Sequence, residues 1–156
     1  MKVILPGSYD PVTLGHLEII KWAAERYSEI FVVAFVNPEK KYAFSEEERT
    51  EMLRLATADI GNVTVDFSFG RVVDYMREKG IEKIVKGYRN RTDLDYERIQ
   101  AEYNFAHGGY ETELVFASDG YREISSTAAR ESIISGKNLE KTLPKEVINY
   151  LKDKKV

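Results

Sequence analysis

One histidine of this chain stands where it could act on a phosphate group. His16 follows Gly15 at the predicted start of a helix, where free backbone amides and the helix dipole favour an anion. The glycine leaves room for another group to approach the backbone closely. Taken alone, a histidine at a helix start is more often a surface or capping residue, so the surrounding loops must decide its role.

The composition removes most other routes to catalysis. The 156 residues include no cysteine and 2 histidines, which excludes disulfides, thiolate nucleophiles, iron–sulfur clusters and zinc sites that need several soft or imidazole ligands. Chemistry must then use carboxylates, hydroxyls, cations, backbone amides or a histidine. The net charge of −3 argues against nucleic acid held by bulk electrostatics, although a local group of cations could still attract phosphates.

Polar loops follow four of the short apolar runs in the sequence. They comprise residues 6–11, 37–41, 86–91 and 121–127, and they are rich in hydroxyls, amides and cations. Because ligands of open α/β sheets bind at the carboxyl ends of the strands, we expect these loops to meet at one edge. Neither the glycine-rich dinucleotide motif nor a Walker-type loop follows the first run, so a phosphate site must be built in another way.

Short β-rich runs alternate with longer amphipathic stretches, which is the pattern of a parallel sheet covered by helices. The predicted strands are residues 2–5, 29–36, 63–67, 81–86 and 112–117. The predicted helices are residues 15–27, 45–58, 71–79, 92–106, 125–135 and 144–151. We therefore expect an α/β fold with one Rossmann-like domain over residues 1–156, in which a five-stranded parallel sheet has helices on both faces.

The ends of several helices are marked by capping residues. Ser45-Glu46-Glu47-Glu48 forms a capping box, in which Ser45 and Glu48 can each satisfy a free amide of the other. Gly80 and Gly136 are suited to end two further helices. These residues predict where the helices begin and end more sharply than the apolar pattern does.

No segment of the sequence has the pattern of a membrane span or a leader. The longest apolar run, Ile30 to Val36, is far shorter than the roughly 20 residues that cross a bilayer. The first residues lack the apolar region of a signal peptide. We therefore expect a cytoplasmic protein without a membrane partner.

Several ordered motifs resemble those of a known superfamily. The segment Thr13-Leu14-Gly15-His16 is similar to the T/H-x-G-H motif of nucleotidyltransferases, and Ile124-Ser125-Ser126-Thr127 resembles their second motif. Nearly the whole chain resembles the family of bacterial phosphopantetheine adenylyltransferases. The further motifs of that resemblance are Asn37 to Lys41, Phe44 to Arg49, Ala56 to Val63, Lys86 to Arg89 and Asp95 to Glu97.

The resemblance implies a reaction and its participants. Members of the family transfer the adenylyl group of ATP to 4′-phosphopantetheine, which gives dephospho-coenzyme A and pyrophosphate. The implied cofactor is Mg²⁺, the implied assembly is a homohexamer, and coenzyme A is a further expected ligand. Neither a nucleic acid nor a membrane is implied as a partner.

The functional residues of the family map onto matching positions of this chain. Ser8 falls where the family contacts both substrates, and His16 falls where it stabilises the transition state; no residue is assigned to a metal. The positions implied for ATP are Ser8, Tyr9, His16, Gly87, Tyr88, Arg89, Glu97, Tyr121, Arg122, Glu123, Ile124, Ser125, Ser126 and Thr127. The positions implied for the second substrate are Ser8, Lys40, Val72 and Lys86.

Three of these positions depart from the usual residue of the family. Ser8 replaces threonine, Lys86 replaces arginine and Tyr88 replaces leucine. The second change matters physically because lysine offers a point charge where arginine offers a planar two-pronged fork. Charge and hydroxyl chemistry are nevertheless retained, so the departures bear on the choice of acceptor more than on the reaction type.

Simpler interpretations stay open for some of these residues. The cations of residues 86–91 could pair with the carboxylates of residues 93–97 at an exposed helix start, which is a common arrangement of little energetic value. Val72 is apolar and by default would be a core residue. The hydroxyls of residues 125–127 are good helix caps, and capping is compatible with phosphate binding because both use the same helix terminus.

Two other functions also fit the motifs. A nicotinate or nicotinamide mononucleotide adenylyltransferase shares the second motif and would differ in its acceptor. A non-catalytic nucleotide sensor would retain the fold, although the presence of His16 and Lys40 argues against it. A cytidylyltransferase is disfavoured, because Glu123 stands where such enzymes usually have glycine.

Overall fold

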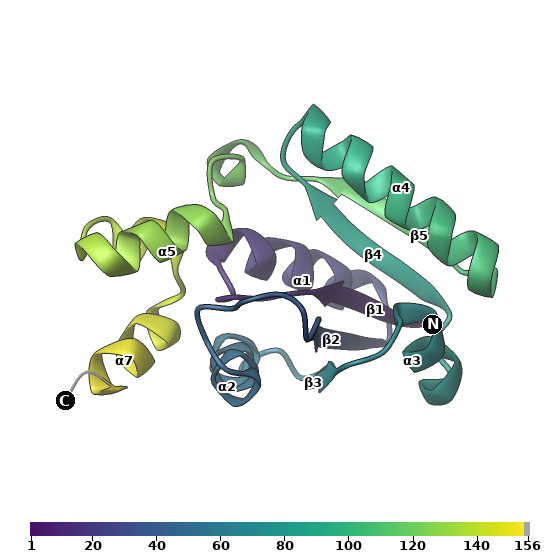
Figure 1. The fold of residues 1–156 in the computed structure, drawn as a ribbon, viewed down its shortest axis with the longest axis horizontal. Helices are drawn as coiled ribbons and strands as arrows, with labels where there is room; N and C mark the ends of the chain where they lie inside the picture. Colours follow the sequence, from purple (N-terminus) through teal and green to yellow (C-terminus); the bar gives the residue numbers. More distant parts are fainter. Residues whose placement is uncertain (155–156) are drawn as a thin grey trace.

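The centre of the structure is a sheet of five parallel strands, seen in a computed structural model that describes residues 1–154 (Figure 1). The strands are β1 (Lys2–Gly7), β2 (Glu29–Phe35), β3 (Val63–Ser68), β4 (Lys83–Tyr88) and β5 (Glu111–Phe116). Their order across the sheet is β3-β2-β1-β4-β5. The chain thus winds outward in both directions from β1, as in doubly wound folds.

The change of winding direction lies between β1 and β4, and these two strands separate along their length. β1 pairs with β2 over six residues, from Lys2 to Gly7. It pairs with β4 only at Val3 and Ile4, opposite Lys83 and Ile84. The carboxyl-terminal halves of β1 and β4 therefore lie apart, and this is the position where ligands bind in open α/β sheets.

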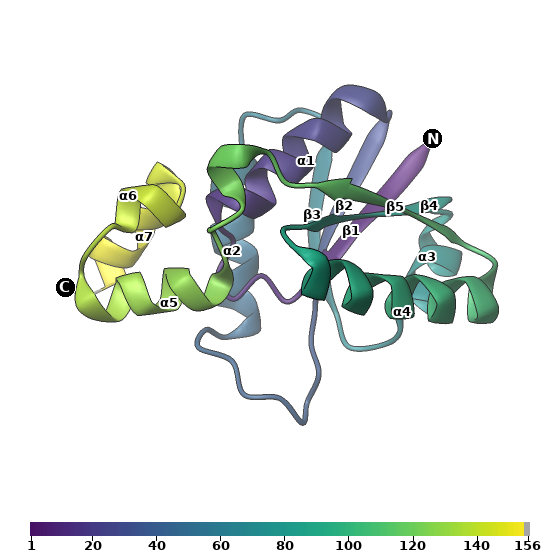
Figure 2. The same cartoon turned by 90° about the horizontal axis from the view of Figure 1, so that it is seen from above.

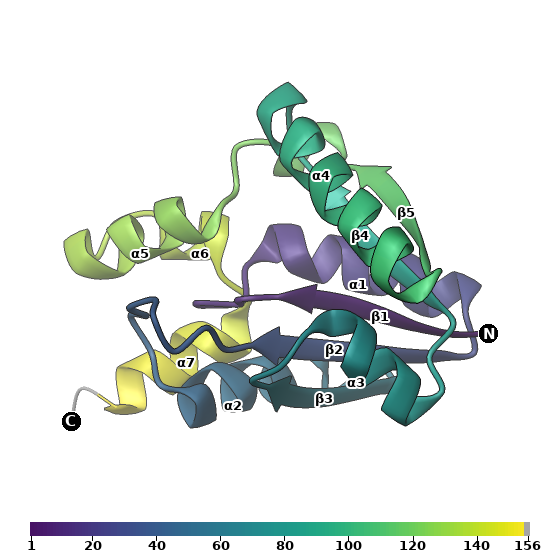
Figure 3. The same ribbon diagram turned by 45° about the vertical axis from the view of Figure 1, so that its right-hand side comes forward.

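Helices cover both faces of the sheet, which confirms the predicted Rossmann-like α/β fold. The helices are α1 (Leu14–Arg26), α2 (Glu46–Thr57), α3 (Val72–Lys79), α4 (Arg91–Gly108), α5 (Ser126–Ser135), α6 (Leu139–Thr142) and α7 (Lys145–Lys154), with a 3-10 turn, η1 (Asp119–Tyr121). Figure 2 shows α1 and α4 on opposite sides of the strands. In Figure 3, α3 and α4 lie in front of the strands and α1 lies behind them.

The core is divided in two by the sheet. Along β2, Ile30, Val32 and Ala34 belong to the cluster that packs against α1 and α2. Phe31 and Val33 alternate with them and belong to the cluster that packs against α3. Both faces of the strand are buried, which explains why its sequence is a continuous apolar run and not an alternating one.

Most predicted boundaries are confirmed to within two residues, although α7 ends at Lys154, three residues beyond its predicted end. The capping box of α2 is formed, with Ser45 and Glu48 exchanging side-chain and backbone hydrogen bonds. Strand β4 begins two residues later than predicted, because the amide of Ile81 is used to close α3 by donating to Met76 O over 2.9 Å. The four-residue α6 was not predicted, since so short a helix has no apolar period.

The carboxyl-terminal helices α5, α6 and α7 lie beside the sheet, on the side toward which β1 runs (Figures 1 and 3). Val147 and Leu151 of α7 are buried in the same cluster as Met52 and Leu53 of α2. An ion pair between Lys154 and Glu48 joins the same two helices. Within residues 1–154, none of the helices is both long and apolar enough to span a bilayer.

A glycine lets β4 lie against α1, and its replacement is expected to destabilise the protein. A Cβ at Gly87 would lie 2.7 Å from Cγ1 of Ile19, so Gly87→Ala should lower the free energy of unfolding by about 1–3 kcal/mol through overpacking. Denaturant unfolding measures this change. The control is Gly61→Ala, because a Cβ there meets nothing within 4 Å. An equal cost of Gly87→Ala in an Ile19→Ala background would contradict the proposed clash.

Candidate active site

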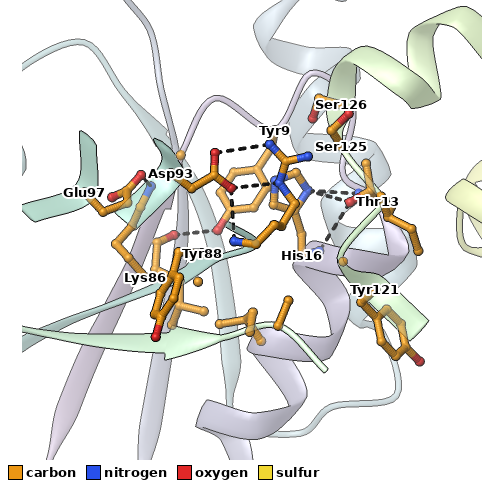
Figure 4. A pocket seen from close by; sticks show the side chains of 18 of the residues that line it. Tyr9, Thr13, His16, Lys86, Tyr88, Asp93, Glu97, Tyr121, Ser125 and Ser126 are labelled. Carbon is orange, nitrogen blue, oxygen red and sulfur yellow. Dashed lines mark hydrogen bonds and ion pairs between the residues drawn. The ribbon is translucent and has the colours of Figure 1, made fainter. Parts of the chain in front are cut away.

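A pocket opens between the separated ends of β1 and β4, and we call it the switch-point pocket (Figure 4). The loops after β1, β4 and β5 all contribute to its lining, and its volume is about 260 Å³. Of the positions implied for ATP or the acceptor, it brings together Ser8, Tyr9, His16, Lys86, Gly87, Tyr88, Arg89, Glu97, Tyr121, Ile124, Ser125 and Ser126. The predicted meeting of polar loops at one edge of the sheet is therefore confirmed.

A second pocket adjoins the first, and we call it the side pocket. Its volume is about 390 Å³, and its lining includes Lys40 and Val72 together with residues of α4. Ser8, Lys86 and Glu97 line both pockets. Two separate binding spaces therefore meet at a common boundary, which is what a reaction between two bound molecules requires.

His16 is oriented by the start of α1. Thr13 is the N-cap, and its hydroxyl accepts the amide of His16 over 3.3 Å. In return, the amide of Thr13 donates to Nδ1 of His16 over 3.0 Å. The sequence left capping open as an alternative to a chemical role for His16, and the ring does complete a capping box. Since Nδ1 faces Thr13, Nε2 is the other polar atom of a ring that lines the switch-point pocket.

The charge state of His16 follows from its surroundings. Burial and the positive charges of Lys86 and Arg89 lower its pKa to about 4. The ring is therefore neutral near pH 7, and because Nδ1 accepts a hydrogen bond from a backbone amide, the proton lies on Nε2. A neutral imidazole with an N–H in a pocket can act as a hydrogen-bond donor to an anion.

The side chain of Tyr9 packs against the ring of His16. Its side chain is buried, its hydroxyl donates to Leu5 O over 2.8 Å, and its ring meets the ring of His16 edge-on at 4.8 Å between centroids. Burial, together with the charge of Glu97, raises the pKa of Tyr9, so the hydroxyl keeps its proton. The side chain of Tyr9 is thus part of the wall that holds His16, and only its pocket-facing atoms are open to a ligand.

The cations of the site are paired with carboxylates on α4. Lys86 donates to Pro6 O over 3.0 Å and lies 3.5 Å from the carboxylate of Glu97. Arg89 forms a two-pronged pair with Asp93, with an Nε–Oδ2 distance of 2.9 Å. The pairing hypothesis drawn from the sequence is therefore confirmed, yet all four side chains also line the switch-point pocket. Pairing and ligand contact are not alternatives here.

Glu97 is the most enclosed acid of the site. It lies at the boundary of the two pockets, and only 13% of its side chain is exposed. Burial raises its pKa, although the charge of Lys86 acts in the opposite direction. The Lys86–Glu97 pair therefore forms a polar divider between the pockets, and Lys86 has one further N–H with which it can meet an incoming phosphate.

The start of α5 provides an anion site beside His16. The hydroxyl of Ser125 accepts the amide of Ala128 over 3.0 Å, and Ser126 donates its hydroxyl to Pro11 O over 3.1 Å. These contacts use the two hydroxyls to hold the helix end in place. The remaining backbone amides of the first turn and the positive end of the helix dipole are then the groups suited to a phosphate.

Three positions implied for ATP do not line either pocket. Thr127 is exposed and its hydroxyl accepts from Arg130 over 3.2 Å, and Glu123 is also exposed. Arg122 donates to Ala117 O over 2.9 Å and lies over the ring of Phe116. These residues shape the loop between β5 and α5, and the pocket wall is made by their neighbours Tyr121, Ile124, Ser125 and Ser126.

One buried acid was missed in the sequence although it stands within the first motif. The carboxylate of Asp10 accepts the amides of Ala43 and Phe44, over 2.8 and 3.0 Å. Its own carbonyl accepts from Arg130 of α5 over 2.8 Å. Asp10 thereby holds the Lys40 loop and α5 against the loop after β1. Its position next to Tyr9 was a usable signal, but the distant partners were not visible in the sequence.

The site offers no ready-made metal centre within residues 1–154. No group of three or more histidine, aspartate or glutamate side chains is gathered there in a way that could hold a metal ion. The acids of the switch-point pocket, Asp93 and Glu97, are already paired with cations.

A pocket at the switch point of a doubly wound sheet, with a second pocket beside it, lies where enzymes of open α/β folds bind their ligands. Comparison with known proteins agrees. The sequence profile described as cytidylyltransferase-like matches residues 4–132. The chain is also 38% identical to a phosphopantetheine adenylyltransferase of Corynebacterium efficiens over 155 residues, which cover 99% of this chain and 98% of the relative. The chain belongs to the cytidylyltransferase-like nucleotidyltransferases and, within them, to the phosphopantetheine adenylyltransferase family.

The charge state of His16 can be tested by titration. In a His107→Gln variant, which leaves one histidine, the ring carbons of His16 should keep the NMR shifts of the neutral Nε2–H form from pH 8 to pH 5. They should move only as the pH approaches about 4. The unfolded chain binds this proton near the ordinary pKa of about 6.5, so folding loses stability as the pH falls between the two values. A midpoint near 6.5 in the folded protein would contradict the assignment.

Proposed function

We propose that this protein transfers the adenylyl group of ATP to 4′-phosphopantetheine and releases pyrophosphate and dephospho-coenzyme A. The observation that carries the proposal is the shared boundary of the two pockets, where Ser8 and Lys86 face both. ATP fits the switch-point pocket, which has a helix start and cations for its phosphates. The acceptor is assigned to the side pocket, whose lining includes Lys40 and apolar residues such as Val72.

The proposed reaction is a direct in-line displacement that needs no nucleophile from the protein. An oxygen of the acceptor phosphate attacks the α-phosphorus of ATP. The new phosphorus–oxygen bond forms as the bond to the bridging oxygen of the β-phosphate breaks, and pyrophosphate leaves with that electron pair. Catalysis of such a step consists mainly of positioning and charge stabilisation.

Individual side chains can be assigned to that work. His16 donates from Nε2 to the non-bridging oxygens of the α-phosphate, where negative charge is redistributed in the transition state. Ser8 and Lys86 hold the acceptor phosphate at the boundary of the pockets. The amides at the start of α5 stabilise the pyrophosphate, because the helix terminus favours an anion. Arg89, steadied by Asp93, adds positive charge to the same pocket.

Mg²⁺ is proposed to enter as a complex with ATP. The paired state of Asp93 and Glu97 supports an ion carried by the nucleotide more than one held by the protein. Bound to the phosphates, Mg²⁺ neutralises part of their charge. Because the substrates and products of the reaction are soluble nucleotides and their precursors, we also propose that the enzyme works in the cytoplasm.

We further propose that six copies assemble and that α4 takes part in the contact. Ile99 is 64% exposed and Tyr96 is 61% exposed on this helix, and Tyr103 follows at a helical spacing. Neighbouring exposed apolar side chains on one helix are typical of an interaction surface. Because α4 also lines the side pocket, assembly would bring a subunit contact close to the acceptor. Coenzyme A is proposed as a further ligand, since it contains the product.

The proposed function is tested by an assay of pyrophosphate release with ATP, Mg²⁺ and a choice of acceptors. Turnover with 4′-phosphopantetheine, and dephospho-coenzyme A in the product mixture, is the expected result. Turnover with nicotinate or nicotinamide mononucleotide in its place would show a different acceptor. Binding of ATP without turnover of any acceptor would show a sensor.

His16→Ala should lower kcat by roughly 10²–10³-fold, the usual effect of losing one preorganised donor to a developing charge. Thr13→Ala is the matched control, because it removes the capping hydroxyl and leaves the imidazole in place. It should cost about 1 kcal/mol of stability and far less turnover. Near-normal kcat in folded His16→Ala would contradict the role of His16.

The assembly is tested by light scattering of the purified protein. A mass of about six times 17.9 kDa is expected for the wild type. Ile99→Glu should shift the protein to smaller species, because a charge buried without a partner is costly, whereas Ile99→Leu should leave the mass unchanged. A wild-type monomer at assay concentration would contradict the proposal.

A further inference from the structure

Arg49 is a buried cation with no role in either pocket lining. It lies in the first turns of α2, and only 1% of the residue is exposed. It forms no ion pair with a carboxylate in the described part of the chain, and its Nε has no hydrogen-bond partner there. Burying a guanidinium without a compensating charge is unfavourable, and an apolar residue of similar volume would often be more stabilising. Packing alone therefore does not explain this residue.

The contacts of Arg49 reach both loops that hold the acceptor side of the site. Its Nη1 donates to the carbonyl oxygen of Ser8 over 2.9 Å. Its guanidinium lies 3.9 Å from the centroid of the Tyr42 ring. Ser8 lies at the shared boundary of the pockets. Tyr42 belongs to the loop that carries Lys40, so one side chain contacts both the Ser8 loop and the Lys40 loop.

Tyr42 connects Arg49 to Lys40, because both side chains contact its ring. Its hydroxyl accepts the amide of Asn37 over 2.9 Å, which closes the loop. Nζ of Lys40 lies 5.6 Å from the centroid of the same ring, within the range of a cation–π contact. Arg49 and Lys40 thus share one aromatic ring, and the position of the exposed lysine depends on a ring that the buried arginine holds.

We propose that Arg49 is a positioning residue for the acceptor phosphate, which it serves by fixing Ser8 and Lys40 relative to each other. The inference rests on the proposed function, because it takes the side pocket as the acceptor site. Arg49 also adds a positive charge behind the Ser8 loop, and a phosphate in front of that loop supplies the anion that the buried guanidinium lacks. It makes no contact with the substrate itself.

This role predicts an asymmetric effect on the two substrates. The groups that we assign to ATP alone, at His16, Gly87 and the start of α5, are not among the contacts of Arg49. Arg49→Met should therefore raise KM for 4′-phosphopantetheine about tenfold or more, which is the usual scale for losing a hydrogen bond from a charged group. The KM for ATP should change by less than about threefold, because the substitution removes no hydrogen bond to a group that we assign to ATP alone.

The experiment compares KM for each substrate, kcat and thermal stability in four variants. Arg49→Lys keeps the charge and should recover part of the acceptor KM. Tyr42→Phe keeps the ring and loses only the hydroxyl that accepts from Asn37, so it should raise KM for the acceptor less than Tyr42→Leu, which removes the shared ring. The control is Arg54→Met on the same helix, whose side chain is exposed and pairs only with Glu51.

The outcomes separate the inference from the proposed function. An acceptor KM within twofold of the wild type in Arg49→Met, or equal increases for both substrates, would overturn the positioning role while the proposed function stands. If Arg49→Met does not fold, the comparison of Tyr42→Leu with Tyr42→Phe decides in the same way. A wild-type enzyme that does not use 4′-phosphopantetheine would overturn both.

Discussion

The separation of β1 from β4 is the constraint on which the rest of the structure depends. The two strands pair at only two positions, and the backbone beyond these positions is free to line a pocket. Helices α1 and α4 lie on opposite sides of this gap (Figure 2). Each can therefore send side chains into it: His16 from α1, and Asp93 and Glu97 from α4. The gap brings the imidazole of His16 together with cations and carboxylates of residues 86–97, which lie far from it in the sequence.

Ion pairs between side chains of the site reduce the cost of partly burying its charged groups when no ligand is bound. Lys86 and Arg89 are both partly buried, and each has a carboxylate partner. Partly exposed ion pairs contribute little stability, so a phosphate that offers shorter, charge-assisted hydrogen bonds can compete for the same cations. The ion pairs therefore orient the two cations and leave them able to bind a phosphate. Arg49 differs, because within residues 1–154 it pairs with no carboxylate, and this contrast distinguishes the proposed positioning cation from the cations that line the pockets.

The sequence predicted the fold well because most of its determinants are local. The continuous apolar run of β2 and the capping box at Ser45 are readable from adjacent residues, and both are confirmed. The site was predicted less completely, since its geometry depends on distant contacts. The amides that Asp10 binds are more than 30 residues away, and so is the carbonyl that Arg49 binds.

The dual role of His16 shows why the capping and chemical interpretations of the sequence were never exclusive. A capping box needs an acceptor at the third helical position, and glutamate or glutamine usually provides it. An imidazole can accept at Nδ1 and still donate at Nε2, whereas a carboxylate can only accept. The backbone of Thr13 therefore fixes the tautomer, and burial beside Lys86 and Arg89 keeps the ring neutral. The interaction that begins the helix is therefore the one that orients the hydrogen-bond donor that we propose for the phosphate.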